Sequence, residues 1–115
     1  MMLQDLDAAE LEIKAAEVAS VLRALANERR LLILCRLAEE GEANVTMLAQ
    51  AVGLSQSALS QHLAKMREEG IVTFRRESQT LWYRIADPRV GGLLEALYRL
   101  YCAPAAAMPG KKATR

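Results

Sequence analysis

Residues 48 to 63 read LAQAVGLSQSALSQHL, in which a Gly-Leu-Ser turn separates two short helical segments. Ala49 is small, as a residue must be where a second helix crosses over the first, and Gly53 permits the backbone angle of a tight turn. Leu59 and Leu63, together with Val52 and Leu54, are spaced to pack the two segments together. The stretch predicts a helix-turn-helix.

The two helices of this motif have recognisable ends. The first is expected from Thr46 to Val52, and the second from Gln56 to Glu69, with Gly70 in the position that follows a helix end. Ser55 is the expected N-cap of the second helix. An alternative explanation is that any two helices joined by a glycine turn show this pattern.

The outward face of the second helix carries short polar and cationic side chains that can reach base edges and phosphates. They are Gln56, Ser57, Ser60, Gln61 and Lys65. His62 follows directly in the motif. It is either a phosphate contact or metal ligand, or a residue that only packs or caps locally.

A β-hairpin is expected after the motif, because two segments rich in β-branched and aromatic residues, 71 to 76 and 80 to 85, flank a polar Glu-Ser-Gln. Arg75 and Arg76 lie on one strand, and Gln79 and Thr80 are placed at the tip. A hairpin of this charge suits a wing that meets the neighbouring DNA backbone or minor groove. The order of the elements therefore favours a DNA-reading helix-turn-helix over an incidental one.

Helices are also expected on both sides of this region. Apolar residues recur at helical spacing from residue 3 to 25, from 28 to 40 with Asn27 as N-cap and Gly41 as the stop, and from Asp87-Pro88 to about residue 102. Residues 104 to 115 show no apolar periodicity and are expected to form a disordered tail. The prediction is one mainly α-helical domain with a β-hairpin wing over residues 1–103.

Composition supports a single helical domain, since 52% of the residues are hydrophobic and only 4% aromatic. The net charge of +1 is uninformative as a total, but basic residues gather between positions 55 and 85. The longest apolar run, residues 31 to 35, is too short for a bilayer, and the acidic first twenty residues argue against a signal peptide. We expect a cytoplasmic protein with no membrane partner.

Three stretches resemble the ArsR/SmtB family of winged-helix repressors: residues 24 to 31 (ALANERRL), residues 54 to 63 (LSQSALSQHL) and the arginine-rich wing. The resemblance covers roughly residues 10 to 103. It implies a winged helix-turn-helix homodimer whose first and last helices form the interface. It also implies binding to an inverted-repeat double-stranded DNA operator that is released when an inducer acts.

Many members of that family sense metals, but this chain has one histidine and two cysteines, Cys35 and Cys102. Zinc or arsenic sites need three or four converging ligands. No Cys-x-Cys occurs in the helix that starts at Thr46, and the last helix has no histidine. The sequence predicts neither a metal site nor a cofactor.

The placement of the cysteines, one in the second core helix and one at the end of the last helix, resembles the persulfide- and redox-sensing branch of the family. In that branch two such cysteines lie close within one subunit. An oxidant or reactive sulfur species joins them by a disulfide or polysulfide bridge, which lowers the affinity for DNA. Arg36 or Arg99 would lower the pKa of a nearby thiol and so favour the reactive thiolate.

Other interpretations stay open at this point. Cys35 is alternatively a small buried hydrophobic residue and Cys102 an incidental thiol. A metal-regulated repressor, a small thiol-disulfide enzyme and a winged helix that binds protein are the competing functions; the enzyme lacks Cys-x-x-Cys spacing and an activating base. Aromatic residues at 82, 83, 98 and 101 favour core and dimer-interface positions over an inducer pocket.

Overall fold

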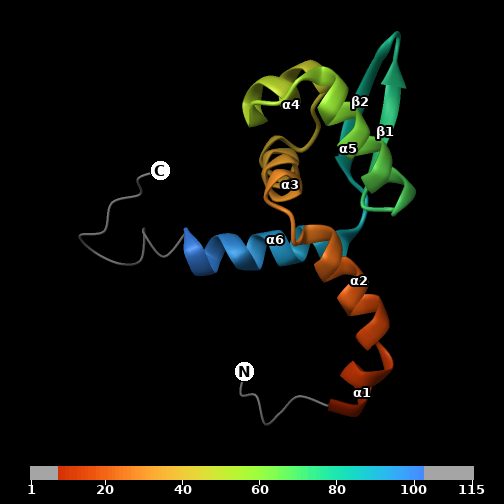
Figure 1. Cartoon of the computed structure of the whole chain (residues 1–115), viewed down its shortest axis with the longest axis vertical. Coiled ribbons are helices and arrows are strands. Elements are labelled where there is room, and N and C mark those ends of the chain that lie inside the picture. The colour runs from red at the N-terminus through yellow and green to blue at the C-terminus, as the bar shows by residue number, and fades with distance from the viewer. Residues whose placement is uncertain (1–7, 103–115) are drawn as a thin grey trace, which may run out of the picture.

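The computed structural model describes residues 8–102. Within this range the chain folds into helices and one two-stranded antiparallel sheet, so the mainly α-helical fold with a hairpin wing is confirmed (Figure 1). The elements are α1 (Ala8–Ile13), α2 (Ala15–Leu25), α3 (Glu28–Glu40), α4 (Val45–Val52), α5 (Gln56–Glu68), β1 (Val72–Glu77), β2 (Thr80–Ile85) and α6 (Pro88–Tyr101).

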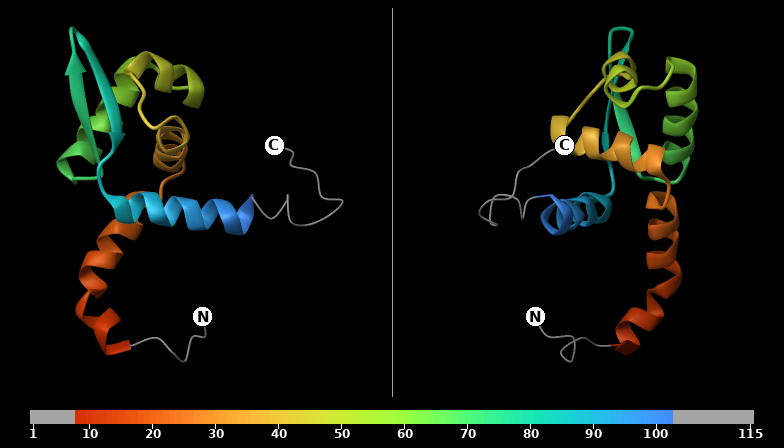
Figure 2. Two further views of the ribbon diagram at one scale, coloured as in Figure 1. Left: turned by 180° about the vertical axis from the view of Figure 1, so that it is seen from behind. Right: turned by 60° about the vertical axis from the view of Figure 1, so that its left-hand side comes forward.

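Helix α3 is the centre of the core. Its Ile33, Leu34 and Leu37 are buried, and they belong to the same buried cluster as Leu48 of α4 and Leu63 of α5. Figures 1 and 2 show α3 between the α4–α5 pair on one side and α6 on the other. The fold therefore places the helix-turn-helix and the last helix on opposite sides of one central helix.

Helix ends follow the predicted caps. The side chains of Asn27, Ser55 and Asp87 accept hydrogen bonds from backbone amides at the starts of α3, α5 and α6, at 3.0, 3.0 and 2.9 Å. Gly53 has φ 70°, the left-handed conformation that ends α4 and opens the turn to α5. Ala49 is buried beneath this turn, as the helix crossing requires.

The hairpin is one residue longer than expected at its tip. Glu77 is still in β1 and pairs with Thr80, so the turn consists of Ser78 and Gln79, and Thr80 starts β2. Thr80 starts the second strand as expected and flanks the turn, while the expectation that Glu77 belongs to the turn was wrong, because the ladder continues to the last pair before a two-residue turn. An isolated bridge between Ala43 and Tyr83 ties the base of the hairpin to the segment between α3 and α4.

The first helix differs most from the prediction. Within the described residues it is two helices, α1 and α2, that meet at Lys14. The Lys14 amide donates to the carbonyls of both Glu10 and Leu11, which tightens the turn, and α1 buries no side chain that would keep it aligned with α2. Residues 3 to 7 of the predicted helix and the tail at 104–115 lie outside the described residues. None of the helices described is long and apolar enough to cross a membrane.

Candidate nucleic-acid interface and cysteine pair

Helix α5 separates its side chains cleanly into two faces. Leu59, Leu63 and Met66 are fully buried against the core. The predicted reading residues Gln56, Ser57, Ser60, Gln61 and Lys65 are all exposed on the other side. The Gln56 amide also donates to the Thr46 hydroxyl at 3.3 Å, which joins the starts of the two motif helices. The structure thus brings the predicted reading residues together on one accessible surface.

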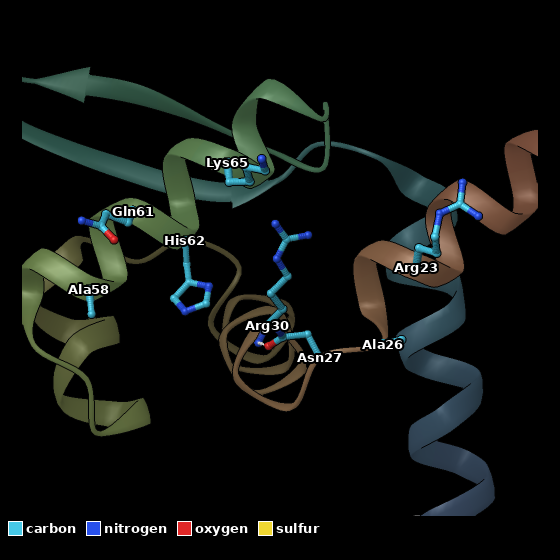
Figure 3. Close-up of a pocket in the computed structure, with 8 residues that line it drawn as sticks. All are labelled: Arg23, Ala26, Asn27, Arg30, Ala58, Gln61, His62 and Lys65. Carbon is cyan, nitrogen blue, oxygen red and sulfur yellow. Dashed lines mark hydrogen bonds between the residues drawn. The ribbon is translucent and has the colours of Figure 1, made fainter.

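His62 lies on the flank of this face and is half-buried. It borders a hollow of about 520 Å³ between α5 and the end of α2 (Figure 3). No cluster of three or more His, Cys, Asp or Glu side chains suited to a metal ion occurs within residues 8–102. His62 thus lies at the edge of the reading face, where both a phosphate contact and local packing remain open to it.

Sequence reasoning missed two residues of this hollow, Arg23 and Arg30. The full lining is Arg23, Ala26, Asn27, Arg30, Ala58, Gln61, His62 and Lys65. Arg30 lies in the stretch that carried the family resemblance, but no helical periodicity links residues 23 and 30 to α5. Only the packing of α2 and α3 brings them beside the reading helix.

The two arginines of β1, Arg75 and Arg76, have different surroundings. Arg75 donates to both carboxylate oxygens of Glu42, at 2.9 and 3.0 Å, and lies over the Trp82 ring at 5.8 Å. This hydrogen bonding lowers the pKa of Glu42 and raises that of Arg75. Arg76 points to the other face of the hairpin, since neighbours on a strand alternate, and forms no ion pair within residues 8–102. Of the two arginines of β1, Arg76 is therefore the one whose charge is not already matched by a carboxylate among the described residues.

Both cysteines are exposed free thiols on helices that pack together: Cys35 on α3, and Cys102 at the end of α6. The interpretation of Cys35 as a buried core residue is therefore wrong. The pKa of Cys35 is raised, first by partial burial of its thiol, then by Cys102 and by Glu39. The effect of Cys102 on this pKa places the two thiols within electrostatic range of each other.

The expectation that an arginine lowers the pKa of a cysteine thiol finds no support at Cys35. Arg36 turns to Glu39 at 3.0 Å and Glu40 at 3.8 Å, while Arg99 pairs with Glu95 at 3.3 Å. Each guanidinium is engaged by carboxylates on its own helix, so neither acts on Cys35 as an unpaired charge. The raised pKa is the direct correction to that expectation.

A second surface, opposite the reading face, is apolar. Large hydrophobic side chains of α1, α2 and α6 are exposed in the single chain: Leu11, Ile13, Val18, Leu22, Tyr98, Leu100 and Tyr101. Ile13 is 82% and Tyr101 80% exposed. Tyr83, by contrast, is buried in the core, with its ring 5.2 Å from that of Phe74. The aromatic residues therefore divide between the core and this outer surface, with Trp82 half-buried.

A helix-turn-helix with an exposed polar reading helix and a following hairpin defines a winged-helix DNA-binding protein. The family model described as "Bacterial regulatory protein, arsR family" matches residues 27–73. The "Transcriptional activator HlyU" of Vibrio cholerae is 47% identical over 93 residues, covering 81% of this chain and 85% of that protein. The chain belongs to the ArsR family of transcriptional regulators.

Solved structures agree with this assignment. The transcriptional repressor BigR from Xylella fastidiosa superposes with a TM-score of 0.78 at 38% identity, over 84% of this chain and 98% of that one. The AntR antimony-specific transcriptional repressor superposes with a TM-score of 0.76 at 38% identity, over 85% and 87%. These relatives are regulators and not enzymes, so the thiol-disulfide enzyme is set aside.

Proposed function

We propose that this chain is a transcriptional repressor that binds an inverted-repeat operator as a homodimer and releases it when Cys35 and Cys102 are joined. The observation that carries the DNA-binding part is the exposed face of α5, beside a wing that presents Arg76 and Gln79. Gln61 and its neighbours on α5 read base edges, and Lys65 and the wing contact the backbone. A DNA-binding repressor of a bacterial family acts in the cytoplasm.

The homodimer is supported by the exposed apolar surface of α1, α2 and α6. Leaving side chains as exposed as Ile13, Leu100 and Tyr101 in water is unfavourable. A second copy of this chain presents the same apolar side chains and can cover them. Dimerisation is typical of the family. A two-fold pair of reading helices would then match two operator half-sites about one turn of DNA apart.

The switch is supported by three features of the cysteines: both are exposed, their helices pack together, and Cys102 affects the pKa of Cys35. The raised pKa disfavours the thiolate at Cys35, so we assign the first attack to Cys102. Its thiolate takes the outer sulfur of an organic persulfide (RSSH), giving Cys102–S–SH and releasing the thiolate RS⁻. Cys35 then attacks the inner sulfur, forms the disulfide and releases its proton with hydrosulfide as H₂S.

A longer bridge is the second outcome of the same chemistry. If both thiols are first converted to persulfides, one displaces hydrosulfide from the other and leaves a trisulfide. Peroxide instead gives the disulfide and two waters. Either bridge ties the end of α6 to α3, which packs against α4, and α4 in turn packs against α5. Strain on α3 therefore reaches the reading helix through α4.

The test compares operator binding by wild type, Cys35→Ser and Cys102→Ser, before and after an organic persulfide, by fluorescence anisotropy. All three reduced proteins are expected to bind alike, and only wild type is expected to release DNA. Mass spectrometry is expected to find one added sulfur in Cys35→Ser and slower uptake in Cys102→Ser. A serine variant that releases DNA as wild type does would contradict the dithiol switch.

A metalloid-responsive repressor is the second candidate, because the antimony-specific AntR is among the similar structures. Two neighbouring thiols are suitable soft ligands for a trivalent metalloid, although a full site needs a third donor. Release of operator by antimonite, and not by persulfide, from the same reduced protein would favour this candidate. Binding of DNA that does not weaken with salt would instead favour a protein partner.

A further inference from the structure

We infer that the hollow between the end of α2, the start of α3 and α5 binds one backbone phosphate of the operator, with Arg23 and Lys65 as its cationic arms and Arg30 as a fixed third cation. This inference rests on the proposed DNA-binding function and adds to it a contact outside the reading helix and the wing. The hollow has a volume of about 520 Å³ and opens to solvent beside Gln61 and Lys65 (Figure 3).

The lining of the hollow is strongly one-sided in charge. It contains Arg23, Arg30 and Lys65 together with His62, and no aspartate or glutamate. Figure 3 shows Arg30 reaching into the space between the helices beside His62 and Lys65 of α5, while Arg23 stands across from them on α2 with its guanidinium turned outward to solvent. Among these cations Arg30 is paired with a carboxylate from outside the lining, Glu69. Arg23 and Lys65 form no ion pair among the described residues, so a phosphate placed between them gains two charge-assisted contacts.

Arg30 is held in place by contacts from two other elements. Its Nη1 donates to the Glu69 carboxylate at 3.0 Å and to the Ala24 carbonyl at 3.4 Å, and its side chain is only 13% exposed. No other nitrogen of this guanidinium has a partner within residues 8–102, so donors remain available. A guanidinium fixed in this way loses little side-chain entropy when it binds an oxyanion.

Asn27 adds an uncharged donor to the same site. Its Oδ1 accepts from the Arg30 amide as the N-cap of α3, which fixes the carboxamide and leaves its NH₂ group without a partner in the described chain. Neutral amide donors and arginines together are the usual ligands of a DNA phosphate. The hollow therefore offers charge and directional donors in one place.

The position of the hollow selects a backbone phosphate over a base. Gln61 belongs both to the hollow and to the reading face, and Lys65 follows it one turn later on α5. When α5 lies in the major groove, the flank of the helix faces the groove wall, which is sugar and phosphate. A contact there fixes how deeply and at what angle α5 enters the groove.

The variant to make is Arg23→Gln, because Arg23 is exposed and forms no ion pair among the described residues, so its loss leaves the fold intact. The matched control is Arg29→Gln, which makes the same charge change on an exposed residue of α3 that does not line the hollow. Arg23→Gln is expected to weaken binding to operator and to unrelated DNA about tenfold and to reduce the salt slope by about one. Arg29→Gln is expected to bind nearly as wild type does.

A scan with single neutral methylphosphonates in the operator locates the contact. At one position in each half-site, the methylphosphonate is expected to lower the DNA affinity of wild type and of Arg29→Gln about tenfold. The same substitution is expected to change the affinity of Arg23→Gln little. Equal sensitivity of Arg23→Gln and wild type at every position would overturn the inference, as would equal affinities of Arg23→Gln and Arg29→Gln.

Calorimetry with inorganic phosphate separates a DNA phosphate from a small anion. If Arg23→Gln loses phosphate binding but keeps full DNA affinity, the hollow serves a free anion and the inference fails. If wild type does not bind operator DNA at all, it is the proposed function that fails. The two failures are therefore distinguishable with the same set of proteins.

Discussion

The two ends of this molecule leave their apolar side chains in opposite states. At the reading end, α4, α5 and the hairpin bury residues such as Leu48, Leu59 and Leu63 completely within one chain. At the other end, α1 has no buried side chain, and α6 leaves Leu100 71% and Tyr101 80% exposed. The reading end is thus complete in the single chain, whereas the other end needs a second copy to cover it.

The difference separates two tasks within one small chain: one end holds the DNA-contacting side chains in place, and the other end associates with a second copy. A self-supporting reading end keeps its DNA-contacting side chains in fixed positions. The apolar end contributes its stabilisation only on association. Cys35 lies on the central helix and Cys102 at the end of α6, so a bond between them would link the incomplete end to the core that supports the reading end.

The largest expected effect tests whether the reading end supports itself. Leu59→Ala removes a fully buried side chain at the helix crossing and is expected to cost about 2–5 kcal/mol of unfolding free energy at every protein concentration. Leu100→Ala is expected to cost stability only at concentrations where the dimer forms. Urea denaturation over a range of concentrations measures both. A loss under about 1 kcal/mol for Leu59→Ala would break the comparison.

The next effect tests the incomplete end. Leu100→Glu places a charge on the apolar surface and is expected to weaken self-association at least tenfold by sedimentation velocity, since a buried unpaired charge is costly. Its circular dichroism is expected to stay unchanged. Gln50→Glu adds the same charge on exposed α4 and is the control. Equal association of both variants would show that α6 lies outside the interface.

A smaller effect distinguishes the two arginines of β1 in the wing. Arg76→Gln is expected to weaken DNA binding about tenfold, whereas Arg75→Gln is expected to weaken it only about two- to threefold, because Glu42 already holds Arg75. Anisotropy titrations at several salt concentrations give both values. If Arg75→Gln lowers the DNA affinity as much as Arg76→Gln does, then the ion pair between Arg75 and Glu42 must break when DNA binds, which would contradict the distinction.

The smallest expected effect is on the alkylation rate of Cys35, which lies on the central helix α3. Because the pKa of Cys35 is raised, its thiolate fraction at pH 8 is lower than that of an ordinary thiol, and its alkylation rate should continue to rise at higher pH. Cys102→Ser removes one cause of the shift and is expected to speed alkylation of Cys35 a few fold. Iodoacetamide rates from pH 6 to 10 by mass spectrometry test this. A rate at neutral pH above that of a free thiol would contradict it.

The sequence was most informative where a single residue type decides the local structure. Asn27, Ser55 and Asp87 cap helices as predicted, and Gly53 takes the left-handed turn, because these roles depend on neighbours within three residues. The same holds for the polar face of α5, whose periodicity is local. The break at Lys14 was missed because no apolar or glycine signal marks it.

The features that sequence could not give depend on contacts distant along the chain. The pairing of Glu42 with Arg75 spans 33 residues, and that of Arg30 with Glu69 spans 39. The expectation that an arginine activates Cys35 failed for the same reason: sequence shows which charges are near, but not that Glu39 and Glu40 already occupy Arg36. The chemical type of each side chain was predictable from the sequence, whereas the choice among its possible ion-pair partners was not.

The most direct test of the account is the stoichiometry and footprint of the reduced protein on its operator, measured together by analytical ultracentrifugation and hydroxyl-radical cleavage. We predict two chains per inverted repeat, with two protected blocks about one turn of DNA, roughly 10–10.5 base pairs, apart. One chain bound to a single protected block would contradict the claim that a complete reading end is paired through an incomplete one.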